Sequence, residues 1–234
     1  MTTKCNLACT YCYRGDCIHN AQSIDIGFAK RGIQDFFQEF QTYHIRYFGA
    51  GEPTLEIGKI KEIHKYAESL SGSKLSSEIQ TNGFFSSVVA QWLAKNIDII
   101  WISCDGPPDI QDTLRPTLQG SRTSAVVERN IATILAHKSS GFVGIRSTIT
   151  PLNIDRQIEM IEYFNQLGVQ AVFSDPVFPP VNLSDNFPSL GASFILDYTK
   201  EFLQARNRAE QLGIFYGSIL TVNFDEKTEL FCRS

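Results

Sequence analysis

The 234-residue chain lacks several features that would assign it at once to a class of protein. It has no run of about 18 or more apolar residues, so we expect no membrane span and no membrane partner. Basic residues are not in excess, with 21 Lys and Arg against 25 Asp and Glu, which argues against nucleic acid as the main partner. The polar start is unlike a secretory signal, and the chain has no internal repeat.

Cysteine is scarce as well, but its distribution is uneven. The chain has six cysteines, too few and too irregularly placed for a disulfide scaffold, and four of them fall within the first 17 residues. In an intracellular enzyme such clustering indicates a metal or redox site. We therefore expect a reducing, cytoplasmic setting. The rest of the composition, 43% hydrophobic and 20% charged, is ordinary for a globular protein.

Segments with strand character alternate with segments of helical periodicity. The expected strands are the end of a first strand at Thr2 and Thr3, then 44–48, 75–80, 97–104, 143–149 and 169–173, with a β-rich stretch at 214–224. The expected helices are 24–43, with Ser23 as its N-cap, 57–70, 86–95, 124–137, 154–167 and 192–212.

This alternation predicts parallel strands joined by right-handed crossovers. About six such units favour an α/β fold with a curved, partial (β/α)6 barrel over a flat sheet. We expect residues 1–213 to form this core and residues 214–234 to form a β-rich C-terminal segment. Polar or glycine-rich motifs follow four successive strands, so they should meet at the carboxyl ends of the strands, where barrels of this kind carry their chemistry.

The first of these motifs contains Cys5, Cys9 and Cys12, which are four and three residues apart. Thiolates at this spacing can reach one compact centre, and they are the natural ligands of iron–sulfur clusters. Three ligands leave one iron open for a small molecule, whereas a fourth from Cys17 would close the site. A zinc site is the alternative, but a second Cys-x-x-Cys pair is missing and His19 is the only nearby histidine.

The pattern Cys-x-x-x-Cys-x-aromatic-Cys resembles the signature of the radical S-adenosylmethionine (SAM) superfamily. The resemblance implies a [4Fe–4S] cluster on the three cysteines, with an open iron that chelates the amino and carboxylate groups of SAM. It also implies that one electron, from an external donor such as flavodoxin or ferredoxin, splits SAM into a 5′-deoxyadenosyl radical that takes a hydrogen atom from the substrate. It places Tyr11 near the adenine, although a packing role suits this ring equally well.

The segment Gly49-Ala50-Gly51-Glu52-Pro53 follows an expected strand and precedes a helix. Glycines let a backbone approach a ligand closely, and exposed carbonyls with Glu52 present negative charge that suits an ammonium group. The superfamily has Gly-Gly-Glu-Pro here, in contact with the methionine amino group of SAM. This resemblance makes Gly49, Ala50, Gly51 and Glu52 cofactor-binding candidates, with Ala50 in place of the first glycine of that motif. An ordinary strand-to-helix turn is the alternative.

A Ser-x-Asp-Gly-Pro motif begins at Ser103, and its serine and Asp105 are two residues apart, so both are expected to point into the barrel. With the later Arg115, the motif resembles the branch of sulfatase and peptide maturases that carry a C-terminal auxiliary-cluster (SPASM) domain. The resemblance assigns Ser103, Asp105 and Arg115 to the SAM site. The alternative for Arg115 is a surface ion pair with Asp109 or Asp112.

Four further residues complete the predictions. Arg146 on the expected strand 143–149 either points inward, towards SAM or a substrate carboxylate, or outward as a solvated charge. Gln111 stands where the branch has a histidine, so no role of that histidine carries over. Cys104 is expected to be a small buried filler. Cys232, the third residue from the numbered end, resembles the start of the auxiliary-cluster domain and predicts a truncated chain.

These patterns predict a radical SAM enzyme that abstracts hydrogen from a peptide or protein substrate, as a maturase does. Three alternatives stay open. The first is a radical SAM enzyme that acts on a small molecule. The second is a truncated module that binds the cluster or SAM without turnover, and the third is a zinc-binding structural protein.

Overall fold

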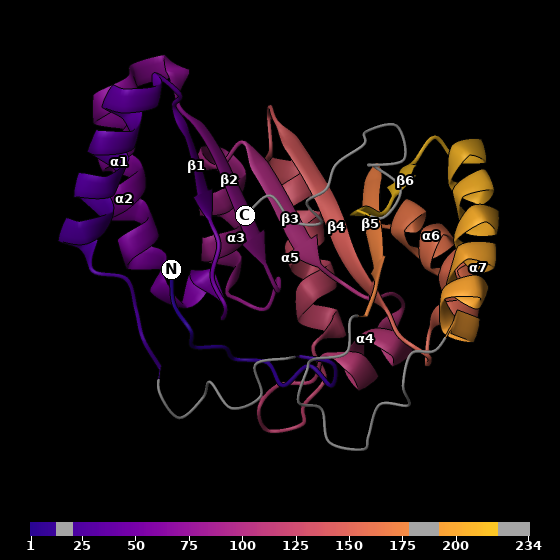
Figure 1. Cartoon of the computed structure of the whole chain (residues 1–234). Coiled ribbons are helices and arrows are strands. Elements are labelled where there is room, and N and C mark those ends of the chain that lie inside the picture. Colours follow the sequence, from indigo (N-terminus) through magenta and orange to yellow (C-terminus); the bar gives the residue numbers. More distant parts are fainter. Residues whose placement is uncertain (13–20, 178–191, 220–234) are drawn as a thin grey trace.

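The computed structural model describes residues 1–12, 21–177 and 192–219. In these ranges the chain forms one six-stranded parallel sheet with the order β1-β2-β3-β4-β5-β6, so each strand pairs with the next one along the chain. Figure 1 shows the sheet curving, with helices arranged around its outside. The predicted α/β partial barrel is therefore confirmed as the fold class.

The strands are β1 (His44–Tyr47), β2 (Ser76–Thr81), β3 (Ile99–Ser103), β4 (Phe142–Ile149), β5 (Ala171–Pro176) and β6 (Phe215–Gly217). The helices are α1 (Ile26–Phe40), α2 (Ile57–Ser71), α3 (Ser87–Asn96), α4 (Pro108–Leu114), α5 (Ser124–His137), α6 (Gln157–Gln166) and α7 (Ala192–Gln211). Short 3₁₀ turns are η2 (Pro53–Glu56), η3 (Gly72–Lys74) and η4 (Ile154–Arg156). Within the described ranges, no helix combines the length and apolar character needed to cross a membrane.

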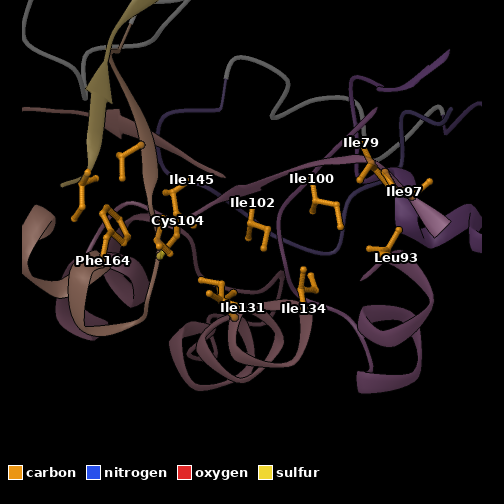
Figure 2. Close-up of a cluster of buried hydrophobic side chains, with 14 of the residues drawn as sticks. Ile79, Leu93, Ile97, Ile100, Ile102, Cys104, Ile131, Ile134, Ile145 and Phe164 are labelled. Atoms are coloured by element: carbon orange, nitrogen blue, oxygen red, sulfur yellow. The ribbon is translucent and has the colours of Figure 1, made fainter. Parts of the chain in front are cut away.

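The core lies between the sheet and the helices on its outer face. Strand residues alternate in burial, so β3 buries Ile100 and Ile102 completely against this layer. Figure 2 shows these side chains close to Ile131 and Ile134 of α5, which are also fully buried. Each fully buried isoleucine contributes about 1.5–3 kcal/mol from apolar burial. This layer therefore stabilises the curved sheet that carries the strand ends.

The opposite, concave face of the sheet is partly open. Its side chains include Trp101, Ser103 and Arg146, which are half-buried and alternate with the core residues. The register of the ladder places Ser103 beside Arg146, and Gly144 beside Trp101. A Cβ atom on Gly144 would lie 2.8 Å from Cε3 of Trp101, so the indole packs directly on the β4 backbone. A cavity of about 870 Å³ borders Trp101, and its lining combines the rings of Phe142, Phe173 and Phe215 with the polar side chains of Lys138 and Gln170.

The prediction that a strand ends at Thr2 and Thr3 is wrong, because no strand of the described sheet includes them. Thr2 forms a single antiparallel bridge with Ser23. The segment then runs along the loop after β1, where Gly51 N–H donates to Thr2 O at 3.0 Å and Glu52 N–H donates to Lys4 O at 2.7 Å. These bonds join the segment at Thr2 and Lys4 to the loop after β1 and not to β1 itself. The segment therefore lies outside the sheet.

Two helix starts also differ from expectation. Asp25, not Ser23, caps α1, because its Oδ1 accepts from Phe28 N–H at 2.7 Å. The hydroxyl of Ser23 is occupied by Lys59, whose Nζ donates to it at 2.7 Å. Helix α4 was not predicted, since its seven residues are too few to show a helical period.

The expected C-terminal segment 214–234 contributes β6, which pairs in parallel with β5. Residues 220–234, with Cys232, and residues 13–20, with Cys17, lie outside the described ranges. The boundary at residue 213 and the truncation therefore stay predictions.

Candidate functional site

The cysteine loop is fixed by the segment that follows α4. Ala8 N–H donates to Pro116 O at 2.8 Å, and Thr10 N–H donates to Leu114 O at 2.9 Å. Next to them, Leu7 is buried and forms an antiparallel bridge with Thr117. Because β3 leads into α4 and this segment, the loop is held at the carboxyl end of the sheet, where barrel topology predicts the site.

Cys5, Cys9 and Cys12 are free thiols on this loop, the first two half-buried and Cys12 exposed. Burial raises the pKa of the Cys9 thiol to about 11, although the neighbouring Arg115 opposes this. Coordination to a metal deprotonates such a thiol, so the donor set suits a thiolate-bound centre. In the described ranges, no three His, Cys, Asp or Glu side chains converge on a single ion. A cluster spreads its ligands over separate irons, and three thiols on one loop are a donor set that it can use.

The backbone of the loop after β1 packs closely against the segment that leads into Cys5. A Cβ atom on Gly51 would lie 2.6 Å from the carbonyl carbon of Lys4, next to Cys5. The glycine thus allows a close approach to this backbone, and the contact with a ligand stays a prediction. Gly49 and Ala50 lie in the same loop, and Ala50 is half-buried. The loop thus holds the entry to the cysteine loop against the end of β1.

This packing makes a prediction for Gly51→Ala. The added methyl meets backbone atoms that cannot rotate away, so we expect the free energy of unfolding to fall by about 1–3 kcal/mol in a denaturant titration. The matched control is Gly58→Ala in α2, where the new Cβ meets nothing within 4 Å and the helix should gain about 0.5–1 kcal/mol. Equal stability of the two variants would contradict the close approach.

Glu52 is buried and its carboxylate is fully occupied, with 2% of the residue exposed. Oε1 accepts from Thr54 N–H at 3.0 Å, from the Thr54 hydroxyl at 2.6 Å and from the Thr81 hydroxyl at 2.6 Å. Oε2 accepts from Asn82 N–H at 2.6 Å. The expectation that Glu52 exposes negative charge to an ammonium group is not met in this geometry. The carboxylate instead ties the β1 loop to the end of β2.

Asn82 continues this network to the cysteine loop. Its Nδ2 donates to Asn6 Oδ1 at 2.7 Å and lies 3.9 Å from Cys5 Sγ. Asn6 in turn donates to Phe84 O at 2.9 Å. In the sequence, Thr81-Asn82-Gly83 is one of the polar motifs that follow a strand and are expected to meet at the strand ends, and the structure places the Asn82 amide beside the cysteine loop.

Tyr11, Asp105 and Arg115 form the second buried polar group of the site. The Tyr11 hydroxyl donates to Asp105 Oδ2 at 2.6 Å and accepts from Arg115 Nη1. The other carboxylate oxygen, Oδ1, accepts from Thr148 N–H on β4 at 2.9 Å. Burial raises the pKa of the Asp105 carboxyl, while the Arg115 cation opposes the rise. The three predicted residues therefore meet, and they connect the cysteine loop to β3 and β4.

The surface ion pair considered for Arg115 is wrong. Its side chain is buried, and its carboxylate neighbour is Asp105, with Nη1 3.9 Å from Oδ2. Asp112 instead caps α5 by accepting from Thr123 N–H at 2.7 Å. Asp109 pairs with Arg156 at 2.5 Å.

Gln111 and Cys104 both lie buried beside Asp105. Gln111 stands in the histidine position, and its Oε1 accepts from Asp105 N–H at 3.0 Å. Cys104 is buried as expected of a filler, and its Sγ lies 3.7 Å from Gly106 O. Both side chains therefore make their contacts with the segment that follows β3.

Ser103 and Arg146 lie on the concave face, so the structure selects the inward alternative for Arg146. Its Nη2 is 2.9 Å from Asp175 Oδ2, and its guanidinium lies over the rings of Trp101 and Phe173, 5.9 and 5.6 Å from their centroids. Asp175 was missed because the expected strand stopped at residue 173. Ser103 and Asp105 do not share one environment, since Ser103 is half-buried and Asp105 has no exposed surface.

The family model described as the Radical SAM superfamily matches residues 1–185. The chain belongs to the radical SAM superfamily. This family uses a [4Fe–4S] cluster and SAM, which agrees with the three free thiols and the buried polar network at the strand ends.

Curated relatives of this radical SAM chain include an uncharacterized protein of Methanocaldococcus jannaschii, 28% identical over 181 residues that cover 76% of this chain and 61% of that protein. Another is the cysteine-type anaerobic sulfatase-maturating enzyme of Clostridium novyi, 25% identical over 191 residues that cover 77% of this chain and 50% of the enzyme. The chain thus spans between half and about three fifths of the length of these two relatives.

Solved structures share the fold. Native anSMEcpe with bound AdoMet and Kp18Cys peptide is 19% identical, with a TM-score of 0.78 over 93% of this chain and 61% of that one. Streptococcus suis SuiB bound to S-adenosylmethionine is 14% identical, with a TM-score of 0.69 over 93% of this chain and 48% of that one. At these identities the likeness concerns the fold alone.

Proposed function

We propose that this chain is the catalytic core of a radical SAM maturase that abstracts a hydrogen atom from a peptide or protein substrate. The observation that carries the proposal is the fixed loop with three free thiols at the carboxyl end of a sheet whose concave face carries the half-buried polar side chains Ser103 and Arg146. The names of similar proteins support a peptide substrate, since one matures sulfatases, and the solved structures include a Kp18Cys peptide and the precursor peptide SuiA.

In this proposal Cys5, Cys9 and Cys12 hold the cluster. When bound, the cluster and SAM supply a 5′-deoxyadenosyl radical after one electron arrives from an external donor such as flavodoxin or ferredoxin. The loop around Gly49, Ala50 and Gly51 borders the site through its backbone. Asp105 and Glu52 are occupied by internal donors, so they orient neighbouring segments.

Ser103 and Arg146 are the predicted cofactor-binding residues on the open concave face. The Arg146 guanidinium has five N–H donors, and stacking on two aromatic rings holds its plane in place. A fixed guanidinium suits a carboxylate through paired hydrogen bonds. One of its nitrogens, Nη2, already pairs with Asp175, and we assign the remaining donors to a carboxylate of SAM or of the substrate.

The test is an anaerobic reconstitution of the chain with iron and sulfide, followed by dithionite and SAM. We expect an iron–sulfur absorbance and release of 5′-deoxyadenosine, measured by chromatography. A candidate peptide is then added, chosen from a precursor or sulfatase encoded nearby. Hydrogen should move from this peptide into 5′-deoxyadenosine, and deuterium labelling of the peptide detects the transfer. A cluster-loaded chain that binds SAM and releases no 5′-deoxyadenosine would contradict the proposal and favour a binding module without turnover.

A further inference from the structure

The environment of Arg115 is unusual for a cation. Only 7% of the residue is exposed, and a buried guanidinium requires charge or hydrogen-bond partners. Nη1 donates to the Tyr11 hydroxyl, and the Asp105 carboxylate lies 3.9 Å away. Among the residues that the structure describes, Nε is buried and has no hydrogen-bond partner. The cation is therefore only partly balanced by its own network.

The backbone around Arg115 carries the cysteine loop. The carbonyls of the residues on either side of it, Leu114 and Pro116, accept the two bonds that hold the loop at Thr10 and Ala8. The Arg115 guanidinium also lies over the Tyr11 ring, 6.0 Å from its centroid. These contacts hold the cation at a fixed place beside the cysteine loop, so this packing sets the distance between the charge and the thiols.

Arg115 lies beside the thiol loop. The carbonyls on either side of it bond to the residues on either side of Cys9, and its guanidinium donates to Tyr11, the residue before Cys12. Asp105 accepts from the same Tyr11 hydroxyl, so a negative charge faces the same part of the loop. Charge interactions are stronger in a buried site than in water, because the effective dielectric constant is lower.

We propose that Arg115 is a positioning residue that raises the reduction potential of the cluster, with Asp105 as the opposing charge. The inference rests on the proposed function only in that Cys5, Cys9 and Cys12 hold the cluster. The one-electron reduction adds a negative charge to the thiolate-bound centre, with the electron supplied by an external reductant. A nearby cation stabilises the reduced form, and net charge around a cluster is among the factors that set its potential.

The test is an anaerobic redox titration of the reconstituted full chain without SAM, in which electron paramagnetic resonance measures the reduced cluster at each potential. We expect the midpoint potential of Arg115→Gln to be more negative than wild type, and that of Asp105→Asn to be less negative. Arg115→Lys, which keeps the charge, should stay close to wild type. The matched control is Arg206→Gln on the exposed side of α7, which removes one positive charge far from the loop and should shift nothing.

A structural role alone predicts loss of iron in the two neutral variants with no shift in the cluster that remains, and this result would overturn the proposal. A SAM ligand predicts an unchanged potential with weaker SAM binding by Arg115→Gln, and this result would overturn it as well. If Arg115→Gln takes up no cluster, Asp105→Asn decides, because an unshifted potential there refutes the charge effect. Failure of the wild-type chain to take up any cluster would instead contradict the proposed function.

Discussion

Replacing Cys9 by alanine is expected to abolish the iron–sulfur absorbance of the reconstituted chain and to reduce release of 5′-deoxyadenosine at least about 100-fold. Loss of residues that only support a metal ligand costs about 10–100-fold, and loss of a ligand should cost more. Cys9 is the half-buried middle member of the three, between bonds from Ala8 and Thr10 that fix its backbone. Alanine leaves those bonds in place, so the loop should persist without its sulfur.

The matched control for this prediction is Cys104→Ala. Cys104 is a free thiol like Cys9, but it is buried near the end of β3 and lies off the cysteine loop. Its replacement removes one sulfur atom from the core and should cost only about 1 kcal/mol of stability, with normal iron content. Cys5→Ala and Cys12→Ala should behave as Cys9→Ala does. Wild-type iron content in any of the three loop variants would refute the assigned ligand set.

The second large effect is expected for Glu52→Gln, which keeps the shape of the side chain and removes an acceptor. Four donors converge on the carboxylate, two of them backbone N–H groups that cannot turn away. In one orientation the new amide nitrogen faces Asn82 N–H, and in the other it faces the donors of Thr54 and Thr81. At least one buried donor then loses its partner, so we expect the free energy of unfolding to fall by about 2–4 kcal/mol.

This loss is measurable in the cluster-free chain by denaturant titration, so the result does not depend on cofactor loading. Glu39→Gln on the exposed surface of α1 is the control and should change stability by no more than about 0.5 kcal/mol. Because Asn82 joins Glu52 to the segment around Cys5, the Glu52 variant should also take up less iron than the control does. If the unfolding curves of the Glu52→Gln and Glu39→Gln variants coincide, the four hydrogen bonds to Glu52 do not stabilise the protein in solution.

Local periodicity predicted the frame of the fold. The helix expected at 124–137 has the bounds of α5, because its apolar spacing is helical and strand-like flanks enclose it. Periodicity did not decide between Ser23 and Asp25 as the cap of α1, since both residue types suit that position. The choice depends on Thr2 and Lys59, which are distant in sequence and occupy Ser23.

The site could be predicted only in part for the same reason. Topology placed the motifs at one edge of the sheet, and the cysteine spacing indicated the ligands. The partners of Glu52 come from Thr81 and Asn82 on another strand, about thirty positions on, and no local pattern reports such a pairing. Arg146 likewise acquires its inward environment from the register of β4 with β5, and alternation along one strand cannot say which face is covered.

The contact between Trp101 and Gly144 has a consequence for the space inside the barrel. The indole can rest on β4 only because residue 144 carries a hydrogen atom where other residues carry a methyl group or more. Any larger substituent would lift the ring away from the sheet and into the open interior. The width of the barrel interior at this level is thus set by a single hydrogen atom at residue 144, so a change of a few atoms there would narrow the space beside Trp101.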